Sequence, residues 1–421
     1  MKKYSLGALV AAGLLAGGLS AGSASAADLG GNCCADLEER IAELEATTAR
    51  KGNRKVSLTI SGWVAQQVVG WDDGYESNVY VGDIGATLSS HFKFTGQATI
   101  SPGWYAGYVL HVEARNANSL GITQNYAGNN GLFDGIGLLQ SFWFIKSDNL
   151  GKVSVGLQSQ ASDNTAILVD GSGSLVPANW VAFDYASFFI RSSTTTASTG
   201  VKFIGVGGCV GGGAIGDCNG GTQNVVRYDS PTFGGFSVSA SWGEDDMWDV
   251  AARYAGEHAG FKFAAAAAYN ENTTETMLPA ARKGDTFEYF QVGAYLEHVP
   301  TGLFVYGAYG NAQYDIASGE SETYYVKAGL RERWTPLGHT VLYGEYENNQ
   351  ADGAAFVQDP TNVGGLATAS DFDLWGLGVV QEIDAAAMSL WLSYRHIEYS
   401  DNTVNDYEDF QYIKAGALIN F

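Results

Sequence analysis

The side chains that most often carry out catalysis are present in this chain, but their surroundings do not favour a catalytic site. Three of the six histidines, His258, His298 and His339, lie in or beside expected tight turns. A hydrolase needs a serine or an aspartate beside a histidine that a third group orients. No Gly-x-Ser-x-Gly motif accompanies these histidines. We therefore expect the chain not to be an enzyme.

The cysteines and the glycine-rich stretches favour structural roles. Cys209 and Cys218 flank a glycine-rich stretch, so we predict a short disulfide that closes a loop between them. Neither this pair nor the adjacent Cys33 and Cys34 has the spacing of a zinc site. The glycine run of residues 205–213 lacks the Lys-Ser or Lys-Thr that follows a phosphate-binding loop. We expect no metal and no cofactor.

The composition excludes other classes of protein. The 421 residues include 23 Lys and Arg against 45 Asp and Glu, a net charge of -22, whereas a protein that binds nucleic acid needs clustered cations. Charged residues make up 16% of the chain, against about 25% in a typical globular protein. Beyond the N-terminus, no apolar stretch reaches the roughly 20 residues of a helical membrane span. A membrane location would therefore require a closed β-barrel.

The N-terminus has the pattern of a cleavable export signal. Lys2 and Lys3 precede an apolar segment, which is followed by small residues and Ala24-Ser25-Ala26. We predict that residues 1–26 are removed; an uncleaved helical anchor is the alternative. Removal deletes two lysines and no acids, which leaves 21 basic and 45 acidic residues and a net charge of -24. The mature chain is expected to be an exported, acidic protein.

Residues 27–55 are predicted to contain one short periplasmic helix. From Cys34 onward, Leu37, Ile41, Leu44 and Thr48 recur at steps of three and four, as in a heptad. About two repeats are too few for an independent coiled coil. The helix either lies on the surface or associates across the subunits of an oligomer.

From residue 56 to residue 421 the apolar pattern has a period of two, which predicts strands. Phe236, Val238, Ala240 and Trp242, for example, alternate with three serines. The expected strands are residues 56–70, 88–100, 104–115, 139–146, 152–160, 223–229, 236–242, 248–254, 261–269, 286–297, 303–309, 322–334, 339–346, 372–382, 388–399 and 408–421. Their connections alternate between tight turns and mostly long polar loops. This rhythm favours an all-β fold, a 16-stranded antiparallel transmembrane barrel, over a sandwich.

A barrel of this size encloses water, and its charged strand residues must face that water. A Lys or Arg that faces lipid at the middle of the bilayer costs roughly 2–4 kcal/mol. The residues that must therefore point inward are Lys93, Lys152, Arg253, Lys262, Arg331 and Arg395.

Three segments carry a resemblance to a known family. Residues Arg227 to Phe236 resemble a hairpin of the general porins of bacterial outer membranes, and residues Asn32 to Gly62 resemble the N-terminus of their alphaproteobacterial (rhizobial) type. The last strand ends in Phe421 with apolar residues at alternate positions before it, which is similar to the C-terminal signature of bacterial barrels. Together these segments identify the chain as resembling a rhizobial-type general porin.

The resemblance implies a homotrimer whose third extracellular loop folds into the barrel and narrows it. Acidic loop residues would then face basic wall residues across a water-filled gap. The acidic candidates are Asp163, Asp170 and Asp184. The basic candidates are Lys93, Arg115, Lys152, Arg227, Arg253, Lys327, Arg331, Arg333 and Arg395. The family often has Arg where this chain has Leu157, so one wall cation is missing.

The expected function is passive diffusion of small hydrophilic solutes and ions across the bacterial outer membrane. The alternatives are a substrate-specific outer-membrane channel and an adhesin-like structural barrel. The expected partners are membrane lipid, lipopolysaccharide and the barrel assembly machinery, which would recognise the terminal Phe421. Nucleic acid is not an expected partner. Acidic residues such as Asp72, Asp73, Glu76 and those at 244–246 either bind divalent cations that bridge lipopolysaccharide or are simply solvated.

Overall fold

The computed structural model describes residues 55–85, 87–117, 119–127, 135–194, 198–203, 222–243, 246–273, 285–315, 319–353 and 367–421. The predicted export signal, the segment predicted to hold the N-terminal helix up to residue 54, and all four cysteines, including Cys209 and Cys218, lie outside the described residues. In these ranges no helix has the length and hydropathy of a membrane span.

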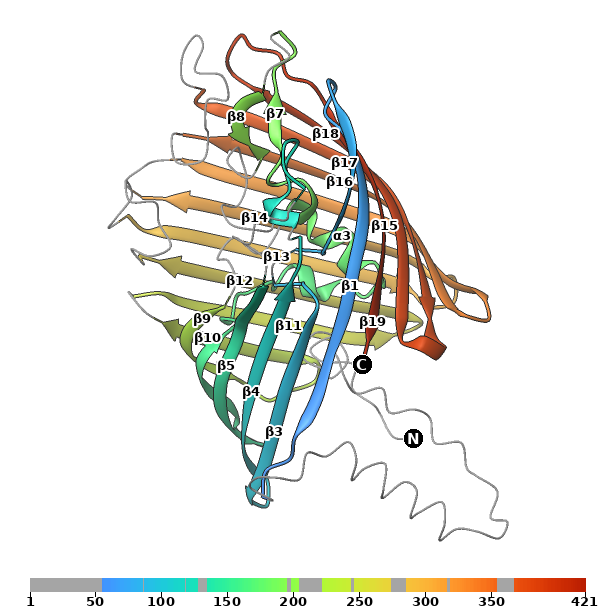
Figure 1. Ribbon diagram of the computed structural model, residues 1–421. Helices are drawn as coiled ribbons and strands as arrows, with labels where there is room; N and C mark the ends of the chain where they lie inside the picture. Colours follow the sequence, from blue (N-terminus) through green and yellow to red (C-terminus); the bar gives the residue numbers. More distant parts are fainter. Residues whose placement is uncertain are drawn as a thin grey trace.

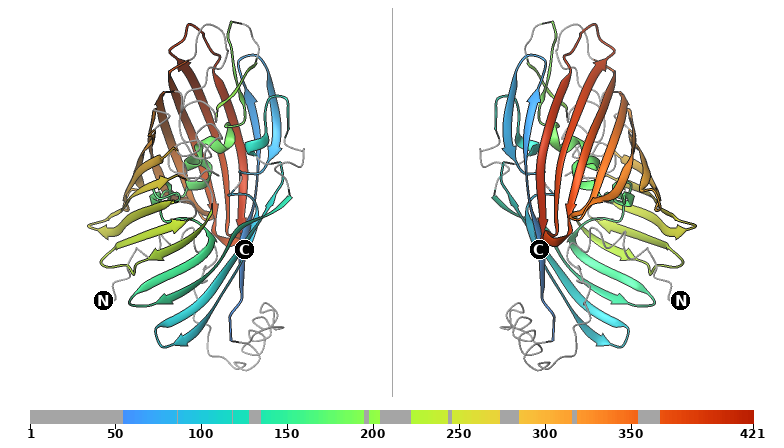
Figure 2. Two further views of the ribbon diagram at one scale, coloured as in Figure 1. Left: turned by 90° about the vertical axis from the view of Figure 1, so that its left-hand side faces the viewer. Right: turned by 90° about the vertical axis from the view of Figure 1, so that its right-hand side faces the viewer.

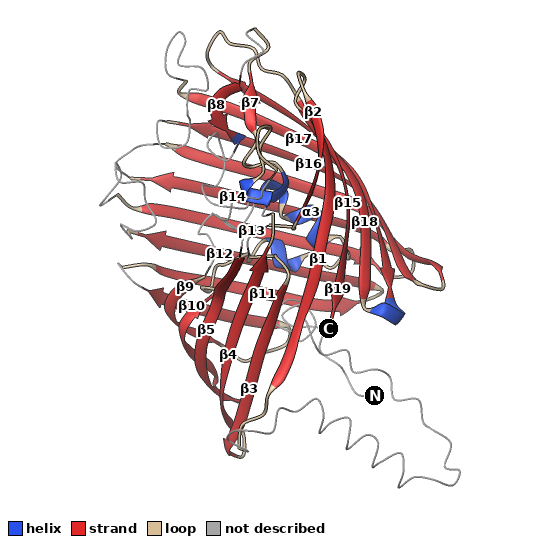
Figure 3. Ribbon diagram, in the orientation of Figure 1, coloured by secondary structure: helices blue, strands red, loops and turns tan. Residues whose placement is uncertain are grey.

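One antiparallel sheet makes up almost all of the described chain and closes on itself (Figures 1 and 3). Its strands are β1 Thr59–Asp72, β2 Ser77–Gly82, β3 His91–Ser101, β4 Trp104–Arg115, β5 Gly135–Ser147, β6 Gly151–Gln158, β9 Gln223–Asp229, β10 Phe236–Gly243, β11 Trp248–His258, β12 Phe261–Asn272, β13 Phe287–His298, β14 Leu303–Tyr314, β15 Glu320–Thr335, β16 Gly338–Asp352, β17 Ala369–Ile383, β18 Met388–Asp401 and β19 Phe410–Asn420. Within the described ranges β2 and β3 share one position, because β2 pairs with the second half of β1 and β3 with its first half. The 17 strands therefore fill sixteen positions, which confirms the predicted fold class.

The first and last strands close the barrel. Strand β1 pairs with β19 from Trp63 opposite Asn420 to Asp72 opposite Gln411. Beyond the last rung, Phe421 and Gly62 exchange two backbone hydrogen bonds of 3.0 Å each. Every strand of the described sheet except the short β2, which pairs with β1 alone, therefore has a neighbour on both sides, and the sheet closes into a barrel.

The period-two pattern of the sequence separates the two faces of the barrel wall. On β10, the side chains of Val238 and Trp242 are 53% and 61% exposed, whereas Ser239 and Ser241 are buried. Apolar side chains thus point outward and small polar ones inward, as a barrel in lipid requires. The inward side chains are buried because a segment of the chain lies inside the barrel.

The second barrel position contains a break that the sequence pattern did not predict. Residues 71–87 were expected to form no strand, yet Ser77–Gly82 forms β2. Between β2 and β3 the chain leaves the sheet at Asp83, whose buried carboxylate accepts hydrogen bonds from the backbone of Gly85 at 2.9 Å and of Ser119 at 3.2 Å. Gly85 has φ +112° and lies directly against the ring of Phe183. This break therefore contacts the segment inside the barrel.

Candidate functional site

Residues 159–194, here called the inner loop, follow β6 and lie inside the barrel. They form the short helices η2 Ile167–Val169, α3 Leu175–Asn179 and η3 Val181–Asp184, and then strand β7 Phe189–Arg191, which pairs with β8 Ser198–Lys202. Figure 2 shows these short helices within the barrel at about the middle of its height. A further short helix, η1 Ser119–Gly121, lies in the connection after β4, and η6 Asp384–Ala386 forms the turn before β18. The inner loop therefore lies inside the barrel.

Hydrogen bonds attach the beginning of the inner loop to the wall at β11, β13 and β14. The carboxylate of Asp249 accepts from the backbone N–H of Ser162 at 2.7 Å and from its hydroxyl at 2.6 Å. Gln291 accepts from the N–H of Ala166 at 2.8 Å and donates to the carbonyl of Ser162 at 2.9 Å. The hydroxyl of Tyr306 donates to the carbonyl of Ala166 at 2.8 Å. These buried polar groups hold the loop backbone against one side of the wall.

A buried ion pair attaches the middle of the inner loop to β15. The Nζ atom of Lys327 lies 2.6 Å from Asp170 Oδ2 and donates to Asn179 Oδ1, also at 2.6 Å. The side chains of Lys327 and Asp170 are both 0% exposed. A lysine without such partners would be very costly at this position, because burial opposes its charge.

A second buried cluster, centred on Asp184, attaches the loop to β18 and β19. Asp184 Oδ2 pairs with Lys414 and lies 3.3 Å from the guanidinium of Arg395. Gln67 and Tyr412 donate to the same carboxylate at 2.9 and 3.1 Å. Burial alone would raise the pKa of Asp184, but the charges of Lys414 and Arg395 outweigh burial and hold that pKa below its ordinary value. Asp184 is therefore a charged anchor.

The end of the inner loop is tied to the connection between β1 and β2. The Nε atom of Arg191 donates to Asp73 Oδ2 at 3.0 Å, and its guanidinium also pairs with Glu76. Asp73 is 2% exposed. Two of the acidic residues expected to be solvated or to bind cations are thus ion-pair partners of the loop.

A cavity of about 660 Å³, here called the bore cavity, lies between the inner loop and the wall from β1 to β12. Residues of the short turns after β5 and β9, such as Asp148 and Pro231, line it as well. The cavity therefore reaches the rim of the barrel that carries the short turns. On the loop side it is lined by Asp163, Thr165, Leu168 and Trp180.

The predicted basic residues fall into two groups, of which the first lines the bore cavity. This group contains Lys93, Lys152, Arg227 and Arg253. Arg227 and Lys152 both pair with Asp229, at 2.7 and 3.0 Å. Arg253 donates to neutral acceptors, among them Ser239 Oγ at 2.6 Å and Thr165 Oγ1 at 2.9 Å.

The second group of predicted basic residues lies away from the bore cavity. Lys327 and Arg395 lie behind the inner loop, in the two buried clusters. Arg331 pairs with Glu382 at 2.9 Å, and Arg333, whose side chain is 48% exposed, pairs with Asp384 at 2.6 Å near a short turn. Arg115 pairs with Glu113 at 3.2 Å. Of the predicted acids, only Asp163 lines the bore cavity, whereas Asp170 and Asp184 anchor the loop.

Several residues of this site were not predicted from the sequence. Lys146 lines the bore cavity and Lys414 anchors Asp184. Both lysines alternate with outward apolar residues, such as Ile145 and Ile413, so the period-two rule could have placed them inside. The contact of Gln291 with the inner loop could not be predicted in this way, because the sequence pattern does not distinguish this glutamine from other polar residues that point inward.

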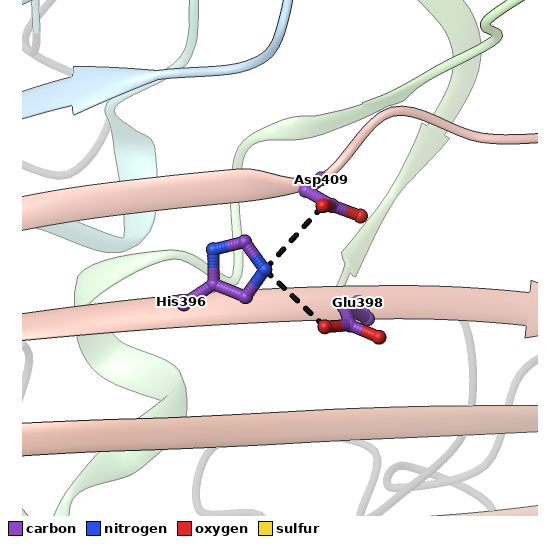
Figure 4. Close-up of side chains that lie close together, drawn as sticks. All are labelled: His396, Glu398 and Asp409. Atoms are coloured by element: carbon purple, nitrogen blue, oxygen red, sulfur yellow. Dashed lines mark ion pairs between the residues drawn. The ribbon is translucent and has the colours of Figure 1, made fainter.

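A separate group of possible cation ligands lies on the outward face of β18 and at the start of β19 (Figure 4). The Nε2 atom of His396 lies 3.3 Å from Glu398 Oε1 and 3.4 Å from Asp409 Oδ2. The ligand atoms all lie within 4.8 Å of one another. The side chains of Glu398 and Asp409 are 60% and 59% exposed, so solvent can satisfy both carboxylates without a metal. This group faces away from the bore cavity.

Comparison with solved structures finds the same fold in outer-membrane porins. The anion-selective porin from Comamonas acidovorans has a TM-score of 0.55 and 15% identity, over 87% of this chain and 100% of its own. OprB of Pseudomonas putida, in its high-pH structure, has a TM-score of 0.55 and 13% identity, over 92% and 97%. OmpT of Vibrio cholerae, in its trimer form, has a TM-score of 0.51 and 13% identity, over 87% and 99%. No curated protein sequence matches the chain.

At identities this low, the solved structures are evidence for the fold alone. The family comparison goes further, because the family described as Gram-negative porin matches residues 8–402, nearly the whole chain. A closed barrel of sixteen positions, an inner loop anchored across it and a bore cavity lined with charged side chains agree with that match. The chain belongs to the Gram-negative porin family.

Proposed function

We propose that this outer-membrane porin passes small hydrophilic solutes and ions by passive diffusion through the bore cavity. The observation that carries the proposal is the bore cavity itself, about 660 Å³ in volume, in which eight charged side chains stand among polar and apolar ones inside a closed barrel. Such a lining favours hydrated solutes and excludes apolar ones. We also propose that the chain performs no catalysis.

Conductance in planar bilayers tests this function. We expect stable channels whose conductance rises in proportion to salt concentration, with no saturation by any added sugar, because a water-filled bore has no tight site to fill. Saturation of conductance or block by one sugar would favour the alternative, a substrate-specific channel. An inserted barrel that does not conduct at all would favour an adhesin-like structural role.

We propose that the constriction is formed by the inner loop opposite the predicted wall residues that line the bore cavity. Asp163 on the loop lies in the same cavity as Lys93, Lys152, Arg227 and Arg253. In this proposal Asp170, Asp184, Lys327 and Arg395 hold the loop in place. In this proposal these four anchoring residues set the width of the bore, and the charged residues that line the cavity set its charge.

We propose that the porin is a homotrimer in contact with lipid and lipopolysaccharide, and that the barrel assembly machinery inserts it. The Vibrio cholerae OmpT structure is in a trimer form, and outward apolar side chains such as Val64 and Leu377, 55% and 60% exposed, suit contact with lipid or a second subunit. We also retain, as proposals, the export signal of residues 1–26, the periplasmic helix of residues 27–55, the disulfide between Cys209 and Cys218, and the rhizobial subtype.

Deletion of Phe421 is expected to prevent assembly. Its backbone forms the two hydrogen bonds to Gly62 that complete the pairing of β1 with β19, and its aromatic side chain, 57% exposed, is free to present a terminal signal. We expect the full chain to migrate on gels as a β-rich trimer whose mobility changes on heating, and the truncated chain to lose this behaviour. Normal heat-modifiable mobility of the truncated chain would contradict the assembly role.

A further inference from the structure

Positive charges outnumber negative charges in the lining of the bore cavity. In the part of the chain that the structure describes, five cationic and three acidic side chains line it, a surplus of two positive charges. The cations are Lys93, Lys146, Lys152, Arg227 and Arg253, and the acids are Asp148, Asp163 and Asp229. The full chain, by contrast, has a net charge of -22. The bore cavity and the whole molecule therefore differ in the sign of their charge.

The surplus arises because two loop acids point away from the bore cavity. Asp170 and Asp184 are buried in ion pairs with Lys327, Lys414 and Arg395, and none of these five residues lines the cavity. Glu345, which also pairs with Arg395 at 2.7 Å, supplies the third acid, so the three cations on that side of the loop are matched by three acids. The face that the loop turns to the bore cavity is mixed: Asp163, its acidic residue, lies there with the polar Asn164 and Thr165 and the apolar Leu168 and Trp180.

The cations of the open wall are only partly neutralised. Asp229 pairs with both Lys152 and Arg227. For Lys93 and Lys146, by contrast, the described residues provide neither a hydrogen bond nor an ion pair, and Arg253 donates only to uncharged oxygens. The positive charge of Lys93 and Lys146 is therefore available to an ion that passes along this wall.

A buried histidine beside Lys93 adds a second unsatisfied group. His111 lies opposite Lys93 in the register of β3 and β4, lines the bore cavity and is 5% exposed. Neither of its ring nitrogens has a hydrogen-bond partner. A buried polar group left in this way is costly unless a ligand or water satisfies it. Lys93 and His111 together suit an anion, which accepts from both.

We propose that the bore cavity prefers small anions, inorganic ones such as chloride and phosphate and organic carboxylates, and that Lys93 and Lys146 set this preference. The inference rests on the proposed diffusion function and names the solute class that it favours. Acidic residues outside the bore cavity do not decide the sign, because salt screens charges in open solvent beyond roughly 8–10 Å.

The reversal potential of the channel in a potassium chloride gradient tests the proposal. We expect the wild-type potential to have the sign of chloride preference. In Lys93→Gln with Lys146→Gln, the ratio of chloride to potassium permeability should fall by roughly fivefold or more, since one unit charge about 4 Å from an ion in water contributes about 1 kcal/mol. Lys262→Gln is the matched control, because Lys262 points inward but does not line the bore cavity, and its ratio should stay near the wild-type value.

The outcomes separate this inference from the function on which it rests. Conducting wild-type channels that prefer potassium would overturn the anion preference and leave the diffusion pore intact. A control variant that changes the ratio as much as the double variant would overturn the role of the two lysines. Trimers that insert but do not conduct would overturn the diffusion function itself. Heat-modifiable mobility of each variant shows that its barrel is assembled.

Discussion

Replacement of Asp184 by alanine is expected to release the inner loop from β18 and β19. The substitution leaves Lys414 and Arg395 buried beside a missing carboxylate, and removal of one partner of a buried ion pair typically costs about 3–5 kcal/mol. Glu345 still pairs with Arg395 at 2.7 Å, so the loss of the ion-pair partner destabilises mainly the buried charge of Lys414. We expect a lower temperature of trimer melting and noisy, larger single-channel currents.

The matched control is Asp163→Ala, which removes a carboxylate from the same loop at a position that lines the bore cavity. It should change ion preference while leaving the melting temperature and the current noise close to those of the wild type. Asp184→Asn should fall between wild type and alanine, because the amide oxygen still accepts from Gln67 but no longer carries charge. Equal stability of Asp184→Ala and wild type would show that the loop is held without this cluster.

The ion pairs of Asp184 predict that the inner loop stays attached in mild acid. The pKa of Asp184 lies below its ordinary value, which is about 3.9 for aspartate. A lowered folded pKa gives stability that is complete above the ordinary pKa and is lost only as the pH falls through the folded value. In the wild type, current noise should therefore be the same at about pH 7 and about pH 5.

The second large effect is expected for Gly293→Val. Gly293 lies on β13 where the inner loop touches the wall, and a Cβ atom there would lie 2.2 Å from the carbonyl oxygen of Ala166. The loop must move, so Ala166 loses its hydrogen bonds to Gln291 and Tyr306. Because valine suits a strand, the wall itself should survive. We expect an assembled trimer with a clearly altered single-channel conductance.

Gly307→Val is the control for this prediction. Gly307 lies on the neighbouring strand β14, where an added Cβ would have its nearest neighbour, the carbonyl oxygen of Tyr325, at 3.7 Å. This is an ordinary contact, so assembly and conductance should be unchanged. Wild-type conductance in Gly293→Val would mean that the loop does not depend on its close approach to this glycine.

The barrel could be predicted from the sequence because lipid outside and water inside impose the same rule on every strand. Phe236 to Trp242 shows this rule locally, without knowledge of its partners, whereas residues 303–309 and 339–346 do not alternate cleanly. Strand β2 was not predicted because its six residues, Ser77–Gly82, are too few to establish a period. The break at Asp83 follows them directly. The pattern therefore predicts long strands and misses short ones.

The inner loop could be predicted only in part. The resemblance implied that it folds inward, and the sequence provided its acids. The direction in which each acid points depends on the path of the backbone, which no periodic rule describes. Asp163 and Asp170 are seven residues apart in sequence, yet the first lines the bore cavity and the second lies behind the loop against Lys327. The role of Gly293 could not be predicted from the sequence either, because it depends on the close approach of Ala166 to this glycine.

The pairing of the first strand with the last has a consequence for the timing of folding. Strand β1 finds β3 after a few tens of residues, but its other neighbour, β19, ends at the C-terminus of the chain. Long-range pairing of this kind is slow, because the entropy of closing the loop is lost before the contacts form. Until then two unpaired strand edges invite aggregation. The chain therefore stays exposed to aggregation until β19 has paired with β1.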